Sequence, residues 1–471
     1  MSTATAAKQR IMGYLPEDRP PWGQMVVLGF QHVITMFPAT VLCALLMGFP
    51  VNTVLTITGL GTVVALIASK LLIGTFIPLY YGSSFSYIAA AVAITQAQYG
   101  VEASPEILSV VQTGFIATAI INIVVGFIIR SAGGKKSLDK VLPPIVTGPV
   151  AAVIGIGLGF AALGMASGTC CLPEGASSLS WWIVSLITLV VTIAFSVYLQ
   201  GKGFIGLIPI LLGAIVGYIV AIPFGLVDFS IIGTSSIITA PRITFPNFFH
   251  PLTITAIFSV GIMAIATIPE STAHLYQISL YVDALAVEQK RDRYRLGQYI
   301  GLNLVVDGLN DFVNGLFGST AGTNYGENNS LMVITRNYSG PVLIMAGAIA
   351  MVLGFIGPLK DIVATVPTAV SGGLAIYLFG VIGMQGIALM MAEKVNLFDP
   401  KQLAIGAVIL IVGIGGNIGY PGGFLPIPLL QGIFPFGWPA IATGAVAGIL
   451  LNLLFLFVKA PEREAIQISL D

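Results

Sequence analysis

Long apolar stretches separated by short polar loops run along this whole chain of 471 residues. A helix needs about 20 apolar residues to cross a bilayer, and such windows predict a first series of segments near residues 23–47, 52–72, 84–99, 107–129, 142–164, 180–199 and 203–227. A second series lies near residues 253–281, 298–318, 327–335, 340–359, 368–391, 403–419 and 435–458. The third and tenth segments are too short, or too rich in Gly, Asn and Ser, for ordinary spanning helices. The pattern predicts an all-α polytopic membrane protein with fourteen transmembrane segments, two of them discontinuous.

Composition and charge agree with this prediction, because 56% of the residues are hydrophobic and only 8% are charged. Cytoplasmic loops retain Lys and Arg, whereas translocated loops lose them. With a cytoplasmic N-terminus, fourteen segments leave only Arg242 and Lys360 of the 20 Lys and Arg residues outside. We therefore expect both termini in the cytoplasm and a protein of the plasma (inner) membrane. The net charge of zero gives no basis for a nucleic-acid partner.

Two series of seven segments predict an inverted repeat, because an odd number of crossings reverses the second copy. Tyr81-Gly82-Ser83-Ser84 opens the short third segment, and Tyr325-Gly326-Glu327-Asn328 opens the short tenth. A second pair of similar motifs follows later in each half, at residues 143–148 and 367–372. Matched short segments with glycine interruptions in two halves point to a transporter's binding site.

The residues before each short segment favour extended structure, at residues 75–81 and 320–325. We expect two short β-strands that pair with each other at the pseudo-twofold axis, since unpaired backbone is costly inside a membrane. Each strand then leads into a half-helix, whose first N–H groups are unpaired and carry the positive end of the helix dipole.

Four carboxylates interrupt the apolar segments, at Glu270, Asp307, Asp311 and Glu327. A charge near the bilayer centre costs about 3 kcal/mol on insertion scales, so such residues are functional candidates. Glu270 and His274 share one helix face and form a candidate proton-handling pair, with a structural buried pair as the alternative. Glu327 lies where a half-helix begins, so a simple capping role is its alternative.

A second group of polar residues is expected to act mainly as scaffold. Asp307 and Asp311 share a helix face with three asparagines, Asn303, Asn310 and Asn314. This stripe forms either a binding wall or, more often, hydrogen bonds to the neighbouring half-helices. His32, beside Gln31, is at least as well explained by an interhelical hydrogen bond as by a ligand contact.

The chain resembles the nucleobase–ascorbate transporter family (nucleobase:cation symporter 2), and is most similar to bacterial uracil permeases. The resemblance rests on residues 31–32, 82–85, 270–274 and 325–336 and extends over roughly residues 20–460. It implies a core of segments 1–4 and 8–11 and a gate of segments 5–7 and 12–14, with a possible homodimer through the gate. The expected parts are an N-terminal tail (1–22), core (23–130), gate (131–227), extracellular linker (228–252), core (253–360), gate (361–460) and C-terminal tail (461–471).

The resemblance also implies roles for individual residues. Glu270 and Glu327 would accept hydrogen bonds from the ring N–H groups of a nucleobase, while the backbone N–H groups of Phe85 and Gly326 would donate to its carbonyls. Tyr325 matches a position close to the substrate, and Glu270 and His274 are the expected proton-coupling pair. Secondary or scaffold positions are expected at Gln31, His32, Ser84, Asp307, Asn328 and Phe379.

Some positions differ from the uracil-permease pattern. Ser330 replaces a usual Gly and Phe379 a gate Tyr, and residues 307–309 and 328–329 look more like the xanthine-transporting branch. Glu327 and His274 favour uracil over that branch. We therefore expect a uracil:H⁺ symporter that works by alternating access, with a xanthine or urate symporter as the alternative. An inorganic-anion or dicarboxylate exchanger is less favoured.

No enzymatic activity, metal or cofactor is expected. The Cys, Ser and His residues do not form a nucleophilic constellation, and the three cysteines lack metal-site spacing. The expected partners are therefore a nucleobase, protons and the lipid bilayer.

Overall fold

The structure is a computed structural model that describes residues 13–458, except residues 133–139, 141, 171, 173–176, 201, 430, 432 and 433. The first half contains α1 (Trp22–Met47), α2 (Val51–Ile73), β1 (Tyr81–Ser83), η1 (Phe85–Tyr87), α3 (Ile88–Thr95), α4 (Pro105–Ala132), α6 (Pro144–Ser167), α7 (Ser178–Tyr198), η2 (Gly203–Leu207), α8 (Pro209–Ala221) and η3 (Phe229–Ile231). The second half begins with α9 (Thr253–Gly261), α10 (Ala264–Glu288), η4 (Leu296–Tyr299), α11 (Ile300–Phe317), β2 (Gly322–Asn324), α12 (Gly326–Thr335) and α13 (Gly340–Leu353). It continues with α14 (Gly357–Ala364), α15 (Thr368–Ala392), α16 (Pro400–Leu410), η5 (Ile411–Gly415), α17 (Gly416–Gly419), η6 (Pro421–Gly423), β3 (Phe424–Leu425), β4 (Trp438–Pro439) and α18 (Ala440–Phe457).

The helices confirm the predicted membrane fold. In the described part of the chain, nine helical stretches are long and apolar enough to cross a bilayer, and three shorter apolar helices accompany them. Every predicted segment coincides with a helical stretch, but the segment predicted at 340–359 ends at Leu353. Pro358 lies in the first turn of a separate helix, α14, where its missing N–H costs nothing.

Prolines and glycines set several helix ends. Pro144 and Pro400 begin α6 and α16, since a fixed φ and a missing N–H suit the first helical position. Gly48 and Gly318 end α1 and α11 in the left-handed conformation, with φ of 75° and 86°, which only glycine adopts without strain.

The two predicted strands pair inside the molecule, as the sequence indicates. β1 and β2 are antiparallel, with Tyr81 opposite Asn324 and Ser83 opposite Gly322. The backbone pairing continues on both sides, because Tyr325 N–H donates to Tyr80 O at 2.9 Å and Ser84 N–H donates to Ala321 O at 3.0 Å. The two chain segments therefore satisfy each other's backbone at the point where the half-helices begin. The second strand pair, β3 with β4, was not predicted.

Two sets of helices pack mainly among themselves, and their members occur in the same order in both halves of the chain, as an inverted repeat requires. The first helix set contains α1–α4 and α9–α13, and the second helix set contains α6–α8 and α15–α18. In the first set α2 packs on α13 and α4 packs on α11. These contacts are equivalent in the repeat, because α11 is the counterpart of α2 in the second half and α13 is the counterpart of α4. In the second set α7–α8 and α16–α18 are related in the same way.

Close helix approach at these related contacts depends on paired glycines. A Cβ atom on Gly59 of α2 would lie 2.5 Å from Gly347 O of α13. A Cβ atom on Gly126 of α4 would likewise lie 2.5 Å from Gly301 O of α11. Small residues allow such backbone contact between membrane helices, so both halves use the same packing device.

Ion pairs and hydrogen bonds hold the connecting segments at the two ends of α2. Near the end of α2, Lys70 pairs with Glu17 at 2.5 Å. Asp18, the next residue in the segment that precedes α1, pairs with Arg291 at 2.7 Å. Near the start of α2, Thr53 Oγ1 accepts a hydrogen bond from Arg242 N–H at 2.8 Å. We call the end of the molecule near Thr53 the outer end and the end near Lys70 the inner end, following the orientation that the charge distribution predicts.

Candidate functional site

Two half-helices begin at the paired strands. β1 passes through Ser84 into η1 and α3, and β2 passes through Tyr325 into α12. Ser84 accepts a hydrogen bond from Ser86 N–H at 3.3 Å, whereas no side chain caps the start of α12. The first N–H groups of a helix have no partner within it. The place where β1 and β2 pair, called the strand crossing, therefore presents N–H donors from both repeats.

Glu270 and Glu327 lie near each other, although they come from different helices. Glu270 is half-buried on α10, directly after Pro269, and Glu327 is exposed in the first turn of α12. Glu270 interacts electrostatically with His274, Glu327 and Asp307. Phe85 and Gly326 are half-buried too, so four of the five predicted substrate contacts retain accessible surface beside a buried strand pair, whereas Tyr325 is buried.

His274 is held in one orientation by Asn324 of β2. Its Nδ1 atom lies 2.6 Å from Asn324 Oδ1 and 3.0 Å from Asn324 O. Both of these atoms are acceptors, so Nδ1 of the ring carries the hydrogen and Nε2 of the neutral ring is an acceptor. A Cβ atom on Gly326 would lie 3.1 Å from Nε2. The free nitrogen therefore faces the start of α12.

A hydrogen-bond network continues behind His274. Asn324 Nδ2 donates to Ser271 Oγ at 2.7 Å, and Ser271 Oγ donates to Asp307. Tyr81 Oη also donates to Asp307, at 2.7 Å. This network links α10 and α11 to both strands, and it places the buried Asp307 behind the site rather than on its accessible surface.

Asp311 stabilises the strand crossing from the other side. One carboxylate oxygen accepts from Gly322 N–H at 2.8 Å and the other accepts from Asn122 Nδ2 at 3.0 Å. Of the two roles considered for the α11 polar stripe, these contacts support scaffolding.

His32 and Asn328 form an interhelical contact. Asn328 Nδ2 lies 3.1 Å from His32 Nδ1 and 3.0 Å from His32 O. The His32 ring is also stacked near Tyr80, at 6.3 Å between centroids. Gln31 precedes His32, and its Oε1 is buried without a hydrogen-bond partner among the described residues. These contacts tie α1 to α12.

The Tyr325 hydroxyl is directed into the strand crossing. It donates to Ser83 O at 2.7 Å and lies 3.1 Å from Thr40 Oγ1. A Cβ atom on Gly82 would lie 2.3 Å from the Tyr325 ring, so the ring occupies the space above that glycine. The side chain therefore holds β1 against the start of α12.

Two residues that depart from the family pattern have clear contacts. Phe379 of α15 is buried and meets Phe85 edge to face, with ring centroids 5.9 Å apart. Ser330 is exposed, and its hydroxyl donates to Gly326 O at 3.0 Å within α12. The half-helix of the first repeat thus contacts the second helix set through an aromatic pair.

Ser271 and Asn324 are the members of this site that sequence reasoning did not select. Both are small polar residues next to selected positions, and only the fold shows that their side chains meet. The signal that could have indicated Asn324 is its place at the end of the predicted strand, directly before the half-helix.

Comparisons with known proteins agree with this architecture. A sequence model of the Permease family matches residues 23–421. The uracil permease of Bacillus caldolyticus is 34% identical over 440 residues, which cover 93% of each chain. The uracil permease of Escherichia coli (strain K12) is 34% identical over 460 residues, which cover 96% of each chain.

A solved structure supports the fold at lower sequence identity. The transmembrane domain of a cyanobacterium bicarbonate transporter, BicA, matches with a TM-score of 0.58 and 13% identity. The match covers 86% of this chain and 98% of that domain. Since permeases move solutes without converting them, the protein is a membrane transporter and not an enzyme. The extent of the family match and the two uracil permeases show that this chain belongs to the nucleobase–ascorbate transporter family.

Proposed function

We propose that this permease imports uracil together with a proton. The observation that carries the proposal is the electrostatic interaction of Glu270 with Glu327, which lies in the first turn of the α12 half-helix, in a chain 34% identical to uracil permeases. Glu270 and Glu327 come from the second repeat and the α3 half-helix from the first, so both halves contribute to one site.

The chemistry of the site complements the edge of a pyrimidine. Uracil carries ring N–H donors between carbonyl acceptors. Glu270 and Glu327 supply carboxyl oxygens that accept from the N–H groups, and the backbone N–H groups of Phe85 and Gly326 supply donors for the carbonyls. Inorganic anions would be repelled by two carboxylates at the same place, which disfavours an anion exchanger.

Glu270 and His274 carry the coupled proton in this proposal. An unpaired carboxylate is costly inside the membrane, so proton uptake removes an unfavourable charge before the site moves. Because Asn324 occupies Nδ1 of His274, Nε2 is the nitrogen that can accept the proton. Asn324, Ser271 and Asp307 position the imidazole.

Transport proceeds by movement of the first helix set, as the core, against the second helix set, as the gate. The separate packing of the two sets supports this division, and the Phe85–Phe379 contact lies between them. In the cell membrane the inner end, with both termini, faces the cytoplasm, in agreement with the Lys and Arg distribution.

Competition for uptake tests the choice of substrate. Cells that express the protein should accumulate radiolabelled uracil, and excess unlabelled uracil should abolish the signal while xanthine and urate leave most of it. Efficient competition by xanthine would favour the purine alternative, which Asn328-Asn329 and Asp307 suggest. Absence of uracil uptake in cells with membrane-inserted protein would reject the proposal.

A further inference from the structure

The loop between α3 and α4, residues 96–104, carries a carboxylate that bridges three segments at the outer end. Glu102 Oε1 lies 3.2 Å from Lys360 Nζ, and Glu102 Oε2 lies 3.3 Å from Arg242 Nη2. Lys360 and Arg242 are the two basic residues that the proposed orientation places outside. Both therefore pair with one carboxylate.

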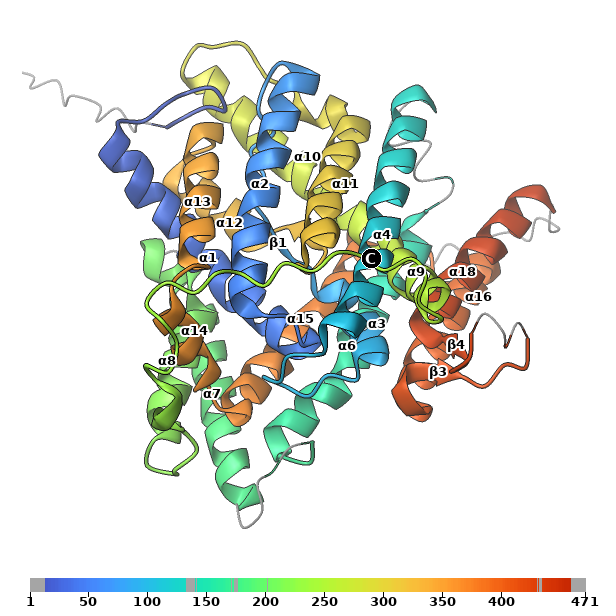
Figure 1. Ribbon diagram of the computed structural model, residues 1–471. Helices are drawn as coiled ribbons and strands as arrows, with labels where there is room; N and C mark the ends of the chain where they lie inside the picture. The colour runs from blue at the N-terminus through green and yellow to red at the C-terminus, as the bar shows by residue number, and fades with distance from the viewer. Residues whose placement is uncertain are drawn as a thin grey trace, which may run out of the picture.

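The two cations lie on the outer connections between the helix sets. Lys360 is on α14, which joins α13 to α15, and Arg242 is on the linker 228–252, which joins α8 to α9. The linker crosses the front of the molecule as an extended yellow-green trace (Figure 1). It is bonded to the segment around α14, because Thr239 N–H donates to Phe355 O at 2.9 Å and Gly357 N–H donates to Ile237 O at 3.1 Å.

The loop itself is fixed to the first helix set. Ala103 N–H donates to Gly48 O at 2.8 Å, and Gly100 N–H donates to Leu45 O at 3.2 Å, so the loop follows the end of α1. The same loop also reaches the second helix set, because Tyr99 Oη is hydrogen-bonded to Ser371 Oγ of α15. The loop therefore fixes Glu102 to the first helix set beside α14 and contacts the second helix set through Tyr99.

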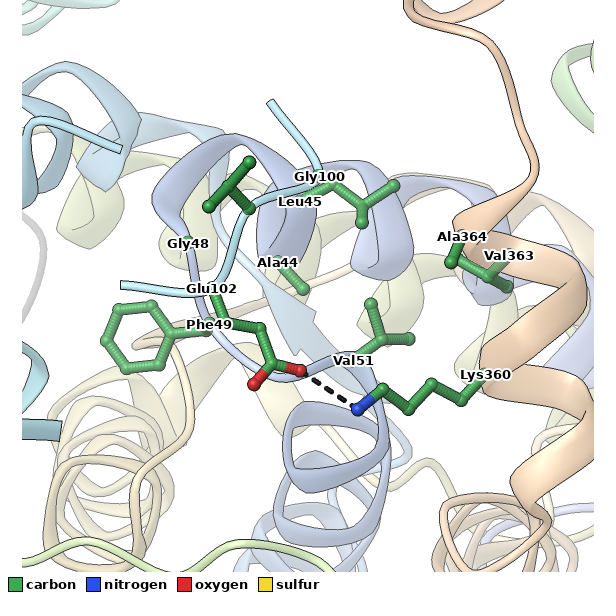
Figure 2. A pocket seen from close by; sticks show the side chains of 11 residues that line it. Ala44, Leu45, Gly48, Phe49, Val51, Gly100, Glu102, Lys360, Val363 and Ala364 are labelled. Atoms are coloured by element: carbon green, nitrogen blue, oxygen red, sulfur yellow. Dashed lines mark ion pairs between the residues drawn. The ribbon is translucent and has the colours of Figure 1, made fainter. Parts of the chain in front are cut away.

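A cavity separates the end of α1 from α14 at this place. Gly48 and Phe49 line one wall, and Lys360, Val363 and Ala364 line the other. Figure 2 shows the Glu102–Lys360 ion pair extending between the two walls. Val363 also packs into the same apolar cluster as Phe49 and Val51, so the ion pair adds a charge contact to the packing beside the cavity.

We propose that Glu102 is a positioning residue for transport, which holds the outer end closed through Lys360 and Arg242 and releases Lys360 when the core moves. The proposal rests on the proposed function, because it requires the two helix sets to move relative to each other. A static structural tie would show the same ion pairs, but its removal would not expose the cavity.

Cysteine labelling distinguishes these cases without any nucleobase. Val363 lines the cavity and is 5% exposed. A Val363→Cys variant, in a background with Cys43, Cys170 and Cys171 replaced by Ser, is treated in cells with a membrane-impermeant maleimide. Glu102→Gln should raise its labelling rate about fivefold, a modest factor because partly exposed ion pairs are weak. Lys360→Gln should act in the same direction.

Glu106→Gln is the matched control. Glu106 lies in the first turn of α4, four residues later, and is exposed; among the described residues its carboxylate pairs only with His250, at 3.8 Å, so its neutralisation should leave the labelling rate unchanged.

Unchanged labelling in both Glu102→Gln and Lys360→Gln would overturn the proposal, and so would an equal increase in Glu106→Gln. Uracil uptake is measured separately in the background protein. Failure of uptake with charge-dependent labelling intact would reject the proposed substrate and leave the role of Glu102 standing.

Discussion

At the scale of single residues, the orientation of His274 is the most informative feature. The spacing of Glu270 and His274 predicted that they share a helix face, and α10 contains both. The partner that orients the imidazole, Asn324, lies 50 residues away on β2. Local spacing cannot show such a contact, because it depends on the strand crossing. Sequence could therefore nominate the carboxylates but not the network behind them.

Ser271→Ala tests that network. Ser271 Oγ accepts from Asn324 and Asn303 and donates to Asp307, so its loss leaves buried polar groups unpaired. We expect the free energy of unfolding to fall by about 1–3 kcal/mol, together with weaker uracil uptake, since His274 loses its fixed orientation. Thermal unfolding and uptake at several external pH values measure the two effects. Ser131→Ala, whose exposed hydroxyl donates to Phe127 O within its own helix, is the control. Wild-type uptake and stability in Ser271→Ala would contradict this role.

At the scale of elements, the two strand–half-helix units were predicted, whereas the helix α14 and the strands β3 and β4 were not. Extended residues before short apolar segments are a local pattern, so the sequence indicated β1, β2 and the segments that follow them. The helix α14 was missed because residues 340–359 form one continuous apolar window despite Pro358. The strands β3 and β4 contribute only two residues each, too few for a periodic signal.

Gly326→Ala tests the close approach of α12 to α10. The new Cβ atom would lie 3.1 Å from His274 Nε2, so the imidazole or the half-helix must shift. Overpacking costs about 1–3 kcal/mol, and we expect uracil affinity to fall roughly tenfold. Competition binding to detergent-solubilised protein measures the change. In the control Gly159→Ala, the added Cβ atom would have no described residue of another segment within 4 Å, and affinity should be unaffected. Equal affinities in all three proteins would contradict the placement of His274 at the site.

At the scale of the whole molecule, the outer linker and α14 connect the two helix sets. Asp361 of α14 accepts hydrogen bonds from Ser235 Oγ, Ser235 N–H and Gly233 N–H. These donors, led by the Ser235 hydroxyl, lower the pKa of the Asp361 carboxyl below its usual value. A lowered pKa in the folded state means that the carboxylate stabilises the fold above the unfolded-state pKa, and that this contribution is lost on acidification.

Asp361→Asn tests the acid-dependent part of this contact. The wild type should lose thermal stability as the pH falls below about 4, the ordinary pKa of an aspartate, and the variant should lose less over the same range. At neutral pH the variant should be the less stable protein. Melting temperatures of purified protein across this range supply the measurement, with the exposed Asp292→Asn as control. If the melting temperatures of the wild type and Asp361→Asn fell in parallel with pH, Asp361 would not contribute acid-dependent stability.

The central claim is that uracil and a proton move together through the site at Glu270 and Glu327. The most direct test is the internal pH of proteoliposomes that contain a trapped pH indicator and no initial gradient. Addition of uracil outside should acidify the interior of wild-type vesicles, while Glu270→Gln vesicles with correctly inserted protein should show no acidification. Uracil entry without any internal pH change in the wild type, or full acidification in Glu270→Gln, would contradict the account.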